Sequence, residues 1–152
     1  MCAVMTLAEV DESPGGPLLD RLVSIMFVGA AAGFVWFLAP LAPDPRGYGT
    51  HEQLGMAACG WAAQGTPCPT CRVTTATTHL VQLHLLDAIR TQPFGAALAG
   101  FSLWLAGVAA WCLVRGRSYL DYLLRLPYGS LVVCGVVLLL ASWVYVYVTF
   151  TP

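Results

Sequence analysis

The stretch "PYGSLVVCGVVLLLASWVYVYVTF", residues 127–150, is long, apolar and free of charged side chains. A helix needs about 20 such residues to cross the hydrocarbon core of a bilayer. In hydrocarbon every backbone polar group must be paired within the segment, which favours a helix. A buried strand is excluded because the valine-rich part extends into neighbours that make the run too long. This stretch therefore predicts a membrane-spanning helix.

Two further stretches share these properties. They are "LVSIMFVGAAAGFVWFLAPLAP" at 22–43 and "PFGAALAGFSLWLAGVAAWCLV" at 93–114. The sequence thus predicts an all-α membrane protein, a single membrane domain over 1–152 with three transmembrane helices at 22–43, 93–114 and 127–150. Small residues such as Gly29 and Gly33 permit close helix packing. No charged residue lies inside a predicted span, so nothing there indicates an ion pathway.

The composition agrees with a membrane protein. Of the 152 residues, 58% are hydrophobic and 10% are charged, and none is lysine, whereas a soluble domain has about 25% charged residues. The net charge of −1 argues against a nucleic-acid partner, because no basic surface could neutralise phosphates. The expected partners are the lipid bilayer and either another protein or further copies of the chain, since three helices leave much surface uncovered.

Arginines predict the orientation. The connection 115–126 holds Arg115, Arg117 and Arg125, and short loops rich in arginine stay in the cytoplasm. The segment 1–21 is then cytoplasmic, and residues 44–92 and the C-terminus lie outside. We expect a multi-pass protein of the bacterial inner membrane with its N-terminus inside. Trp143 and Tyr145, near the outer end of the third span, fit an aromatic belt at the membrane interface.

The outer loop 44–76 contains "CGWAAQGTPCPTC", residues 59–71. Cys68 and Cys71 have the spacing that lets two sulfurs reach one zinc ion. Cys59 and a nitrogen of His51 or His79 would complete a tetrahedral site. The sequence therefore predicts zinc as a possible cofactor.

Three other interpretations of these thiols stay open, because spacing alone selects none of them. Cys59 could form a structural disulfide with Cys68 or Cys71, since the outer side permits disulfides. Cys68 and Cys71 could be a redox-active pair, with the neighbouring Arg72 favouring a thiolate. All three could also be reduced, buried and inert.

Residues 77–92 predict an amphipathic helix at the membrane interface. Val81, Leu85, Ala88 and Ile89 share one side. The hydroxyls at the start of the helix, those of Thr74, Thr75, Thr77 and Thr78, can cap its free backbone N–H groups. The candidate binding residues of the outer loop and this helix are Glu52, Thr74, Thr75, His84, Asp87 and Arg90. Asp87 can reach the side chains three residues away on either side. The alternative for these polar residues is an ordinary solvated face.

The segment "GTHEQLGMAACGWAAQGTPCPTCRVTTA", followed by "QPFGA", resembles the bacterial membrane family catalogued as domain of unknown function 2752. That family typically has an upstream cysteine, a G-x-P-C-P-x-C-G-x-T motif and a short amphipathic helix ending in Asn-Pro or Gln-Pro. The matching residues here are Cys59, Gly65, Pro67, Cys68, Pro69, Cys71, Thr74, Thr75, Gln92 and Pro93. Arg72 stands where the family has a glycine, which would permit a positive φ. The resemblance covers roughly 49–114 and implies no known activity.

Three functions follow as hypotheses. The first is a non-enzymatic subunit or docking module whose outer cysteine loop is stapled by metal or by a disulfide. The second is a membrane thiol–disulfide oxidoreductase in which Cys68 and Cys71 exchange and Cys59 resolves. The third is an oligomeric pore or transporter, against which the uncharged spans argue.

Overall fold

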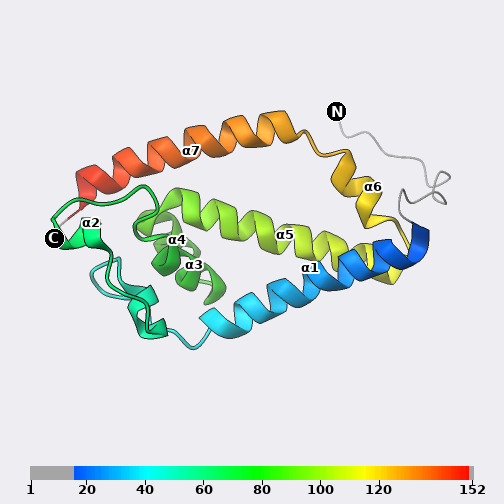
Figure 1. Ribbon diagram of the computed structural model, residues 1–152, viewed down its shortest axis with the longest axis horizontal. Coiled ribbons are helices and arrows are strands. Elements are labelled where there is room, and N and C mark those ends of the chain that lie inside the picture. Colours follow the sequence, from blue (N-terminus) through cyan, green and yellow to red (C-terminus); the bar gives the residue numbers. More distant parts are fainter. Residues whose placement is uncertain (1–15, 151–152) are drawn as a thin grey trace. The chain divides into compact units, whose positions relative to one another are not determined.

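The computed structural model describes residues 16–150, which are helical or irregular and contain no strand. Three long helices dominate (Figure 1): α1 (Gly16–Leu38), α5 (Pro93–Arg115) and α7 (Tyr128–Thr149). Each is long and apolar enough to cross a membrane, since 22 or 23 residues at about 1.5 Å each exceed the thickness of about 30 Å of the hydrocarbon core. The predicted all-α class with three long apolar helices is confirmed.

The first helix does not have its predicted bounds. It begins at Gly16 and ends at Leu38, whereas the sequence predicted 22–43. Pro40 explains the early end, because a proline disfavours helical backbone at the residue before it and lacks a donor N–H. The early start places Asp20 and Arg21 inside the helix. The expectation that no charged residue lies within a long apolar helix is therefore wrong for α1. Residues 1–15 of the predicted cytoplasmic segment 1–21 lie outside the described residues.

The other two long helices agree with the predicted spans to within one residue. Pro93 opens α5, where its missing N–H costs no hydrogen bond. Gln92 is fully buried, and its side-chain oxygen accepts from the backbone N–H of Gly95. It thus satisfies one of the free donors at the start of α5.

Two compact units make up the described chain. The first consists of 16–32 and 103–126. It includes α6 (Tyr119–Leu124) within the predicted cytoplasmic loop. Tyr119 is fully buried with Ala109 and Cys112, and its ring meets that of Phe27 edge-on at 5.3 Å.

Asp20 ties α1 to α6 within this unit. It is 6% exposed. Its carboxylate accepts from the Ser118 hydroxyl at 2.9 Å and from the Leu120 N–H at 2.8 Å. A buried carboxylate thereby satisfies a donor at the start of α6, a role the sequence prediction missed.

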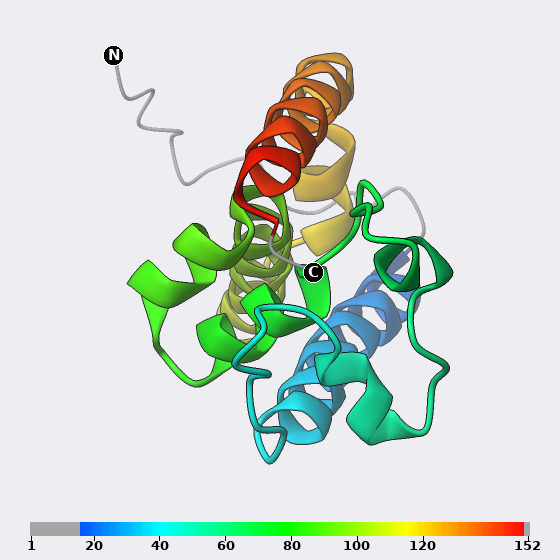
Figure 2. The ribbon, with the colours of Figure 1, turned by 90° about the vertical axis from the view of Figure 1, so that its left-hand side faces the viewer.

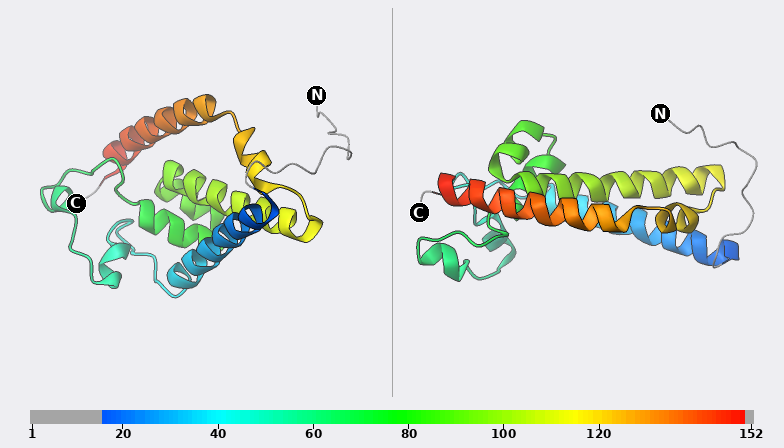
Figure 3. Two further views of the ribbon diagram at one scale, coloured as in Figure 1. Left: turned by 45° about the vertical axis from the view of Figure 1, so that its right-hand side comes forward. Right: turned by 90° about the horizontal axis from the view of Figure 1, so that it is seen from above.

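The second unit consists of 33–102 and 127–150. It contains the 3₁₀ helix η1 (Thr50–Leu54), α2 (Gly60–Ala63), α3 (Val73–Val81) and α4 (Leu85–Thr91). Figure 2 shows the connection from the end of α1 through η1 and α2 to α3. The start of α5 lies beside the last turns of α7 (Figure 3), where the Phe94 N–H donates to the Ser142 hydroxyl at 2.9 Å.

The single helix predicted over 77–92 is wrong. The structure has α3, then a break at which Leu83 has a φ of 64°, then α4. The Gln82 amide donates to the carbonyls of Ala39 and Leu41, at 3.2 and 2.7 Å. This contact holds the end of α3 against the chain leaving α1, so a tertiary interaction overrides the helical periodicity. The predicted apolar side is also divided, because Ala88 is fully buried whereas Leu85 and Ile89 are more than half exposed.

Candidate functional site

The loop 44–76, predicted to lie outside, is built on a buried pair of threonines. The Thr50 and Thr75 hydroxyls are hydrogen-bonded at 2.8 Å and both side chains are buried. Thr50 also accepts from the Asp44 N–H at 3.0 Å. These bonds fasten η1 and the preceding turn to α3. Buried hydroxyls are rarely left unpaired, so the pair sets where the loop lies.

An ion pair closes the turn that leads into η1. Arg46 contacts Asp44 at 2.8 Å and Glu52 at 3.4 Å. Hydrogen bonds from Arg46 hold the pKa of the Asp44 carboxyl below its ordinary value, against a smaller opposing effect of burial. Glu52, predicted to bind a ligand, therefore serves this loop contact.

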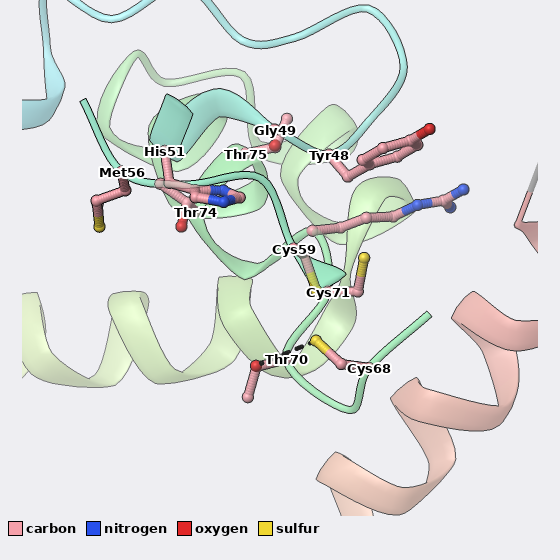
Figure 4. A pocket seen from close by; sticks show the side chains of 11 residues that line it. Tyr48, Gly49, His51, Met56, Cys59, Cys68, Thr70, Cys71, Thr74 and Thr75 are labelled. Carbon is pink, nitrogen blue, oxygen red and sulfur yellow. Dashed lines mark hydrogen bonds between the residues drawn. The ribbon is translucent and has the colours of Figure 1, made fainter. Parts of the chain in front are cut away.

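A cavity of about 300 Å³ lies under the loop. Figure 4 shows its lining, with the three cysteines together and with His51 and Met56 toward the other side. The lining residues are Tyr48, Gly49, His51, Met56, Cys59, Cys68, Thr70, Cys71, Arg72, Thr74 and Thr75. The structure thus brings six predicted site residues, namely His51, Cys59, Cys68, Cys71, Thr74 and Thr75, to one place.

The three thiols differ in their surroundings. At the start of α2 the nearby backbone N–H of Ala62 lowers the pKa of the Cys59 thiol, with smaller contributions from Trp61 and the Cys68 thiol, against an opposing effect of burial. Cys68 also contacts the Thr70 hydroxyl at 3.6 Å. Cys71 is buried, and burial, followed by the neighbouring Cys68 and Cys59, raises its pKa to about 11. Because the thiolate is the reactive form, Cys59 is better prepared to react than Cys71.

The predicted zinc ligands share the cavity, but they are not arranged as a metal centre. Within residues 16–150, no group of three or more His, Cys, Asp or Glu side chains is placed to hold a metal ion. Every cysteine of this described range is a free thiol. The zinc and disulfide interpretations stay predictions.

The polar residues of α4 do not reach the cavity. His84 precedes α4 and its ring lies 6.1 Å from that of His79. In the part of the chain that the structure describes, no ion pair joins Asp87 to Arg90, so the predicted contact is wrong. Arg90 instead offers its backbone carbonyl to the Tyr145 hydroxyl at 2.7 Å.

The threonines do not cap α3. The N-cap is Arg72, which makes no side-chain capping bond. Thr77 and Thr78 donate back to the carbonyls of Val73 and Thr74, at 2.8 and 2.9 Å, as hydroxyls inside helices commonly do. The helix starts at Val73, earlier than predicted, so Thr74 and Thr75 also lie within it and not before it.

Arg72 has a φ of 73°, in the left-handed region that favours glycine. The stretch that contains Arg72 is similar to a known protein family. Residues 61–106 match the family model described as Protein of unknown function (DUF2752). The predicted resemblance to DUF2752 is confirmed over this stretch, which begins two residues after Cys59. No curated protein and no solved structure matches the chain.

The positive φ of Arg72 fits the glycine that the predicted resemblance places at this position. A glycine would adopt this conformation freely, whereas arginine adopts it at a cost of about 1–2 kcal/mol. The DUF2752 match runs through Gln92 and into α5, so it includes the buried amide that caps this helix.

Several residues of the site were not predicted. Tyr48, Met56 and Thr70 line the cavity without belonging to a recognisable motif. Trp143, predicted to lie in an aromatic belt, donates its indole N–H to the Pro67 carbonyl at 3.2 Å. Buried indole donors usually find a partner, but the sequence could not indicate which one.

Proposed function

We propose that this chain is a non-enzymatic docking module of the bacterial inner membrane whose outer loop is stapled by a disulfide between Cys59 and Cys68. The observation that carries the proposal is that both cysteines line one cavity, close enough for the Cys68 thiol to influence the pKa of Cys59. The N-terminus lies in the cytoplasm and the cavity lies outside, on the side where disulfides persist.

The pairing of Cys59 with Cys68 is favoured over the two cysteines of "CPTC". Cys71 is 6% exposed and its pKa is raised to about 11, so its thiolate is disfavoured. Cys59 has a lowered pKa, to which the nearby Cys68 thiol contributes, and it lines the same cavity as Cys68. A staple closing a loop of this length would stabilise the fold by about 2.5–3 kcal/mol in the chain-entropy model.

The stapled loop would present a partner with apolar side chains. Trp61 lies in α2, two residues after Cys59, and is 53% exposed. Met56 lines the cavity and is 52% exposed. Exposed aromatic and methionine side chains are typical of the centres of protein interfaces. The partner is another membrane protein or a second copy of the chain, and not a nucleic acid.

The membrane itself is the second partner. Leu85, Leu86 and Ile89 are 55–68% exposed, and only Gln92 separates α4 from α5. This short connection keeps the exposed side chains of α4 close to where a span enters the bilayer. They would lie at the boundary between headgroups and acyl chains.

Thiol counting on protein purified in detergent tests the staple. We expect Cys59 and Cys68 to resist alkylation until dithiothreitol is added, and Cys59→Ser to release Cys68. Cys134→Ser is the control, because Cys134 is exposed in α7 and does not line the cavity. About one zinc per chain by mass spectrometry, with Cys59, Cys68 and Cys71 protected until a chelator is added, would refute the staple in favour of a metal site.

The lowered pKa of Cys59 favours a thiol–disulfide oxidoreductase as the second candidate. Cys59 would then attack the substrate disulfide and Cys68 would resolve the mixed disulfide, in place of the predicted exchange between Cys68 and Cys71. A Cys68→Ser variant should trap a mixed disulfide on Cys59. If it captures none while the staple forms in the parent protein, the docking module stands.

A further inference from the structure

The last turns of α7 hold the cysteine motif at both ends. The Trp143 indole donates to the Pro67 carbonyl at 3.2 Å, just before Cys68. Just after Cys71, the Arg72 guanidinium donates to the hydroxyl and the carbonyl of Thr149, at 3.1 and 3.0 Å. The two motif cysteines therefore lie on a short segment anchored to one helix on either side.

The Arg72 contact fits the end of α7. The last carbonyls of a helix lack donors within the helix and carry partial negative charge. A guanidinium can satisfy two acceptors at once because its N–H groups lie in one plane and point outward in a fixed fork. The same guanidinium lies 5.8 Å from the centre of the Phe150 ring, which adds a cation–π contact.

The backbone conformation of Arg72 is itself unfavourable. Its φ of 73° lies in a region that is costly for a residue with a side chain, and the contacts with α7 offset this cost. Leu83 is the other non-glycine residue with a positive φ among those described. Leu83 is 81% exposed, whereas the Arg72 guanidinium donates to Thr149 at the end of α7. The two residues therefore share a backbone conformation but differ in side-chain contacts.

We propose that Arg72 is a positioning residue, which anchors the Cys68 segment to α7 and so holds Cys68 within reach of Cys59. This inference rests on the proposed staple. Disulfide formation depends on the effective concentration of one thiol at the other. The contact with α7 raises that concentration, so the transmembrane helix would set how readily the outer loop closes.

The chemistry can be followed with glutathione. The Cys59 and Cys68 thiols each lose a proton and together two electrons, and one sulfur–sulfur bond forms between them. Glutathione disulfide accepts the two electrons and two protons and is released as two molecules of glutathione. The equilibrium constant of this exchange measures the effective concentration in each variant.

The experiment compares three variants in full-length protein in detergent. Arg72→Gly removes the anchor and relieves the backbone, and Leu83→Gly relieves the backbone without an anchor to lose. We expect Arg72→Gly to lower the exchange constant by about three- to tenfold, by the effective-concentration argument, and Leu83→Gly to leave it unchanged. Arg72→Lys keeps the charge but not the paired contact, and should fall between Arg72→Gly and the parent. An unchanged constant in Arg72→Gly, or an equal fall in Leu83→Gly, would overturn the inference.

A second measurement separates this inference from the staple. Hydrogen exchange of the amides of 143–150 is followed in a Cys59→Ser, Cys68→Ser background, where no staple can form. Faster exchange in Arg72→Gly supports the anchor, and unchanged exchange contradicts it. If no disulfide forms in any variant, the staple and this role of Arg72 both fail, and hydrogen exchange still shows whether the anchor exists.

Discussion

Gly95 provides a sharp test of how α3 packs on the start of α5. A Cβ atom added there would lie 2.8 Å from the Gln92 side-chain oxygen and 3.1 Å from the Cα of Val73. Real Cβ atoms essentially never come within 3.0 Å of another atom, and a contact of 3.1 Å is tighter than nine in ten real ones. The Val73 atom belongs to the backbone, which cannot move aside as the flexible Gln92 side chain can. Gly95→Ala should therefore push the first residue of α3 and displace the cap of α5.

Gly100 is the matched control on the same helix. Its nearest neighbour would be a methyl group of Leu80 at 3.8 Å, an ordinary contact. Both changes gain about 1 kcal/mol of helix propensity, which cancels in the comparison. Overpacking costs about 1–3 kcal/mol, and the lost cap about 1 kcal/mol. Gly95→Ala should therefore be about 2–4 kcal/mol less stable than Gly100→Ala.

The assay is unfolding of purified protein in mixed micelles with increasing sodium dodecyl sulfate, followed by circular dichroism. The alkylation rate of Cys71 is a local probe, because this buried thiol lies two residues before Val73. We expect Gly95→Ala to lower the midpoint and speed the alkylation, and Gly100→Ala to do neither. Equal midpoints and equal alkylation rates in the two variants would refute the packing described here.

Three further changes probe the site and the first unit. Since the pKa of Cys71 is raised to about 11 from an ordinary 9, the folded thiol keeps a proton that the unfolded chain releases. Stability should thus fall as the pH rises above 9, and a Cys71→Ala variant should lose this dependence. In the reduced protein, alkylation of Cys59, whose pKa is lowered, should begin at lower pH than that of Cys71. Thr75→Val removes the partner of the buried Thr50 hydroxyl and should cost about 1–3 kcal/mol, with Thr75→Ser retaining most of the stability in the same unfolding assay. Asp20→Ala leaves two donors without their acceptor and should cost about 1–3 kcal/mol, whereas no loss of thermal stability would show that the carboxylate does not hold α6.

The sequence predicted which residues form the candidate site better than it predicted how these residues are arranged. The cysteine motif, His51 and the threonines after it lie close together in the sequence, and all line one cavity. Their relations were not predictable, because spacing cannot tell which thiol accepts backbone N–H groups and which is buried. The polar residues of α4 were placed wrongly for a similar reason, since the break at Leu83 depends on Gln82 reaching the chain after α1.

The sequence by itself determined the three long helices. Runs of more than 20 apolar residues can satisfy their backbone in a membrane only by local hydrogen bonding, so no distant partner is needed to specify them. It also specified the ends of two of them, where Pro93 and Pro127 interrupt the chain. The tertiary structure alone decided the rest: the buried Asp20 at α6, the divided helix after the cysteines, and Arg72 in a backbone conformation suited to glycine. Each of these depends on a hydrogen-bond partner about 40 to 100 residues away, which local pattern does not encode.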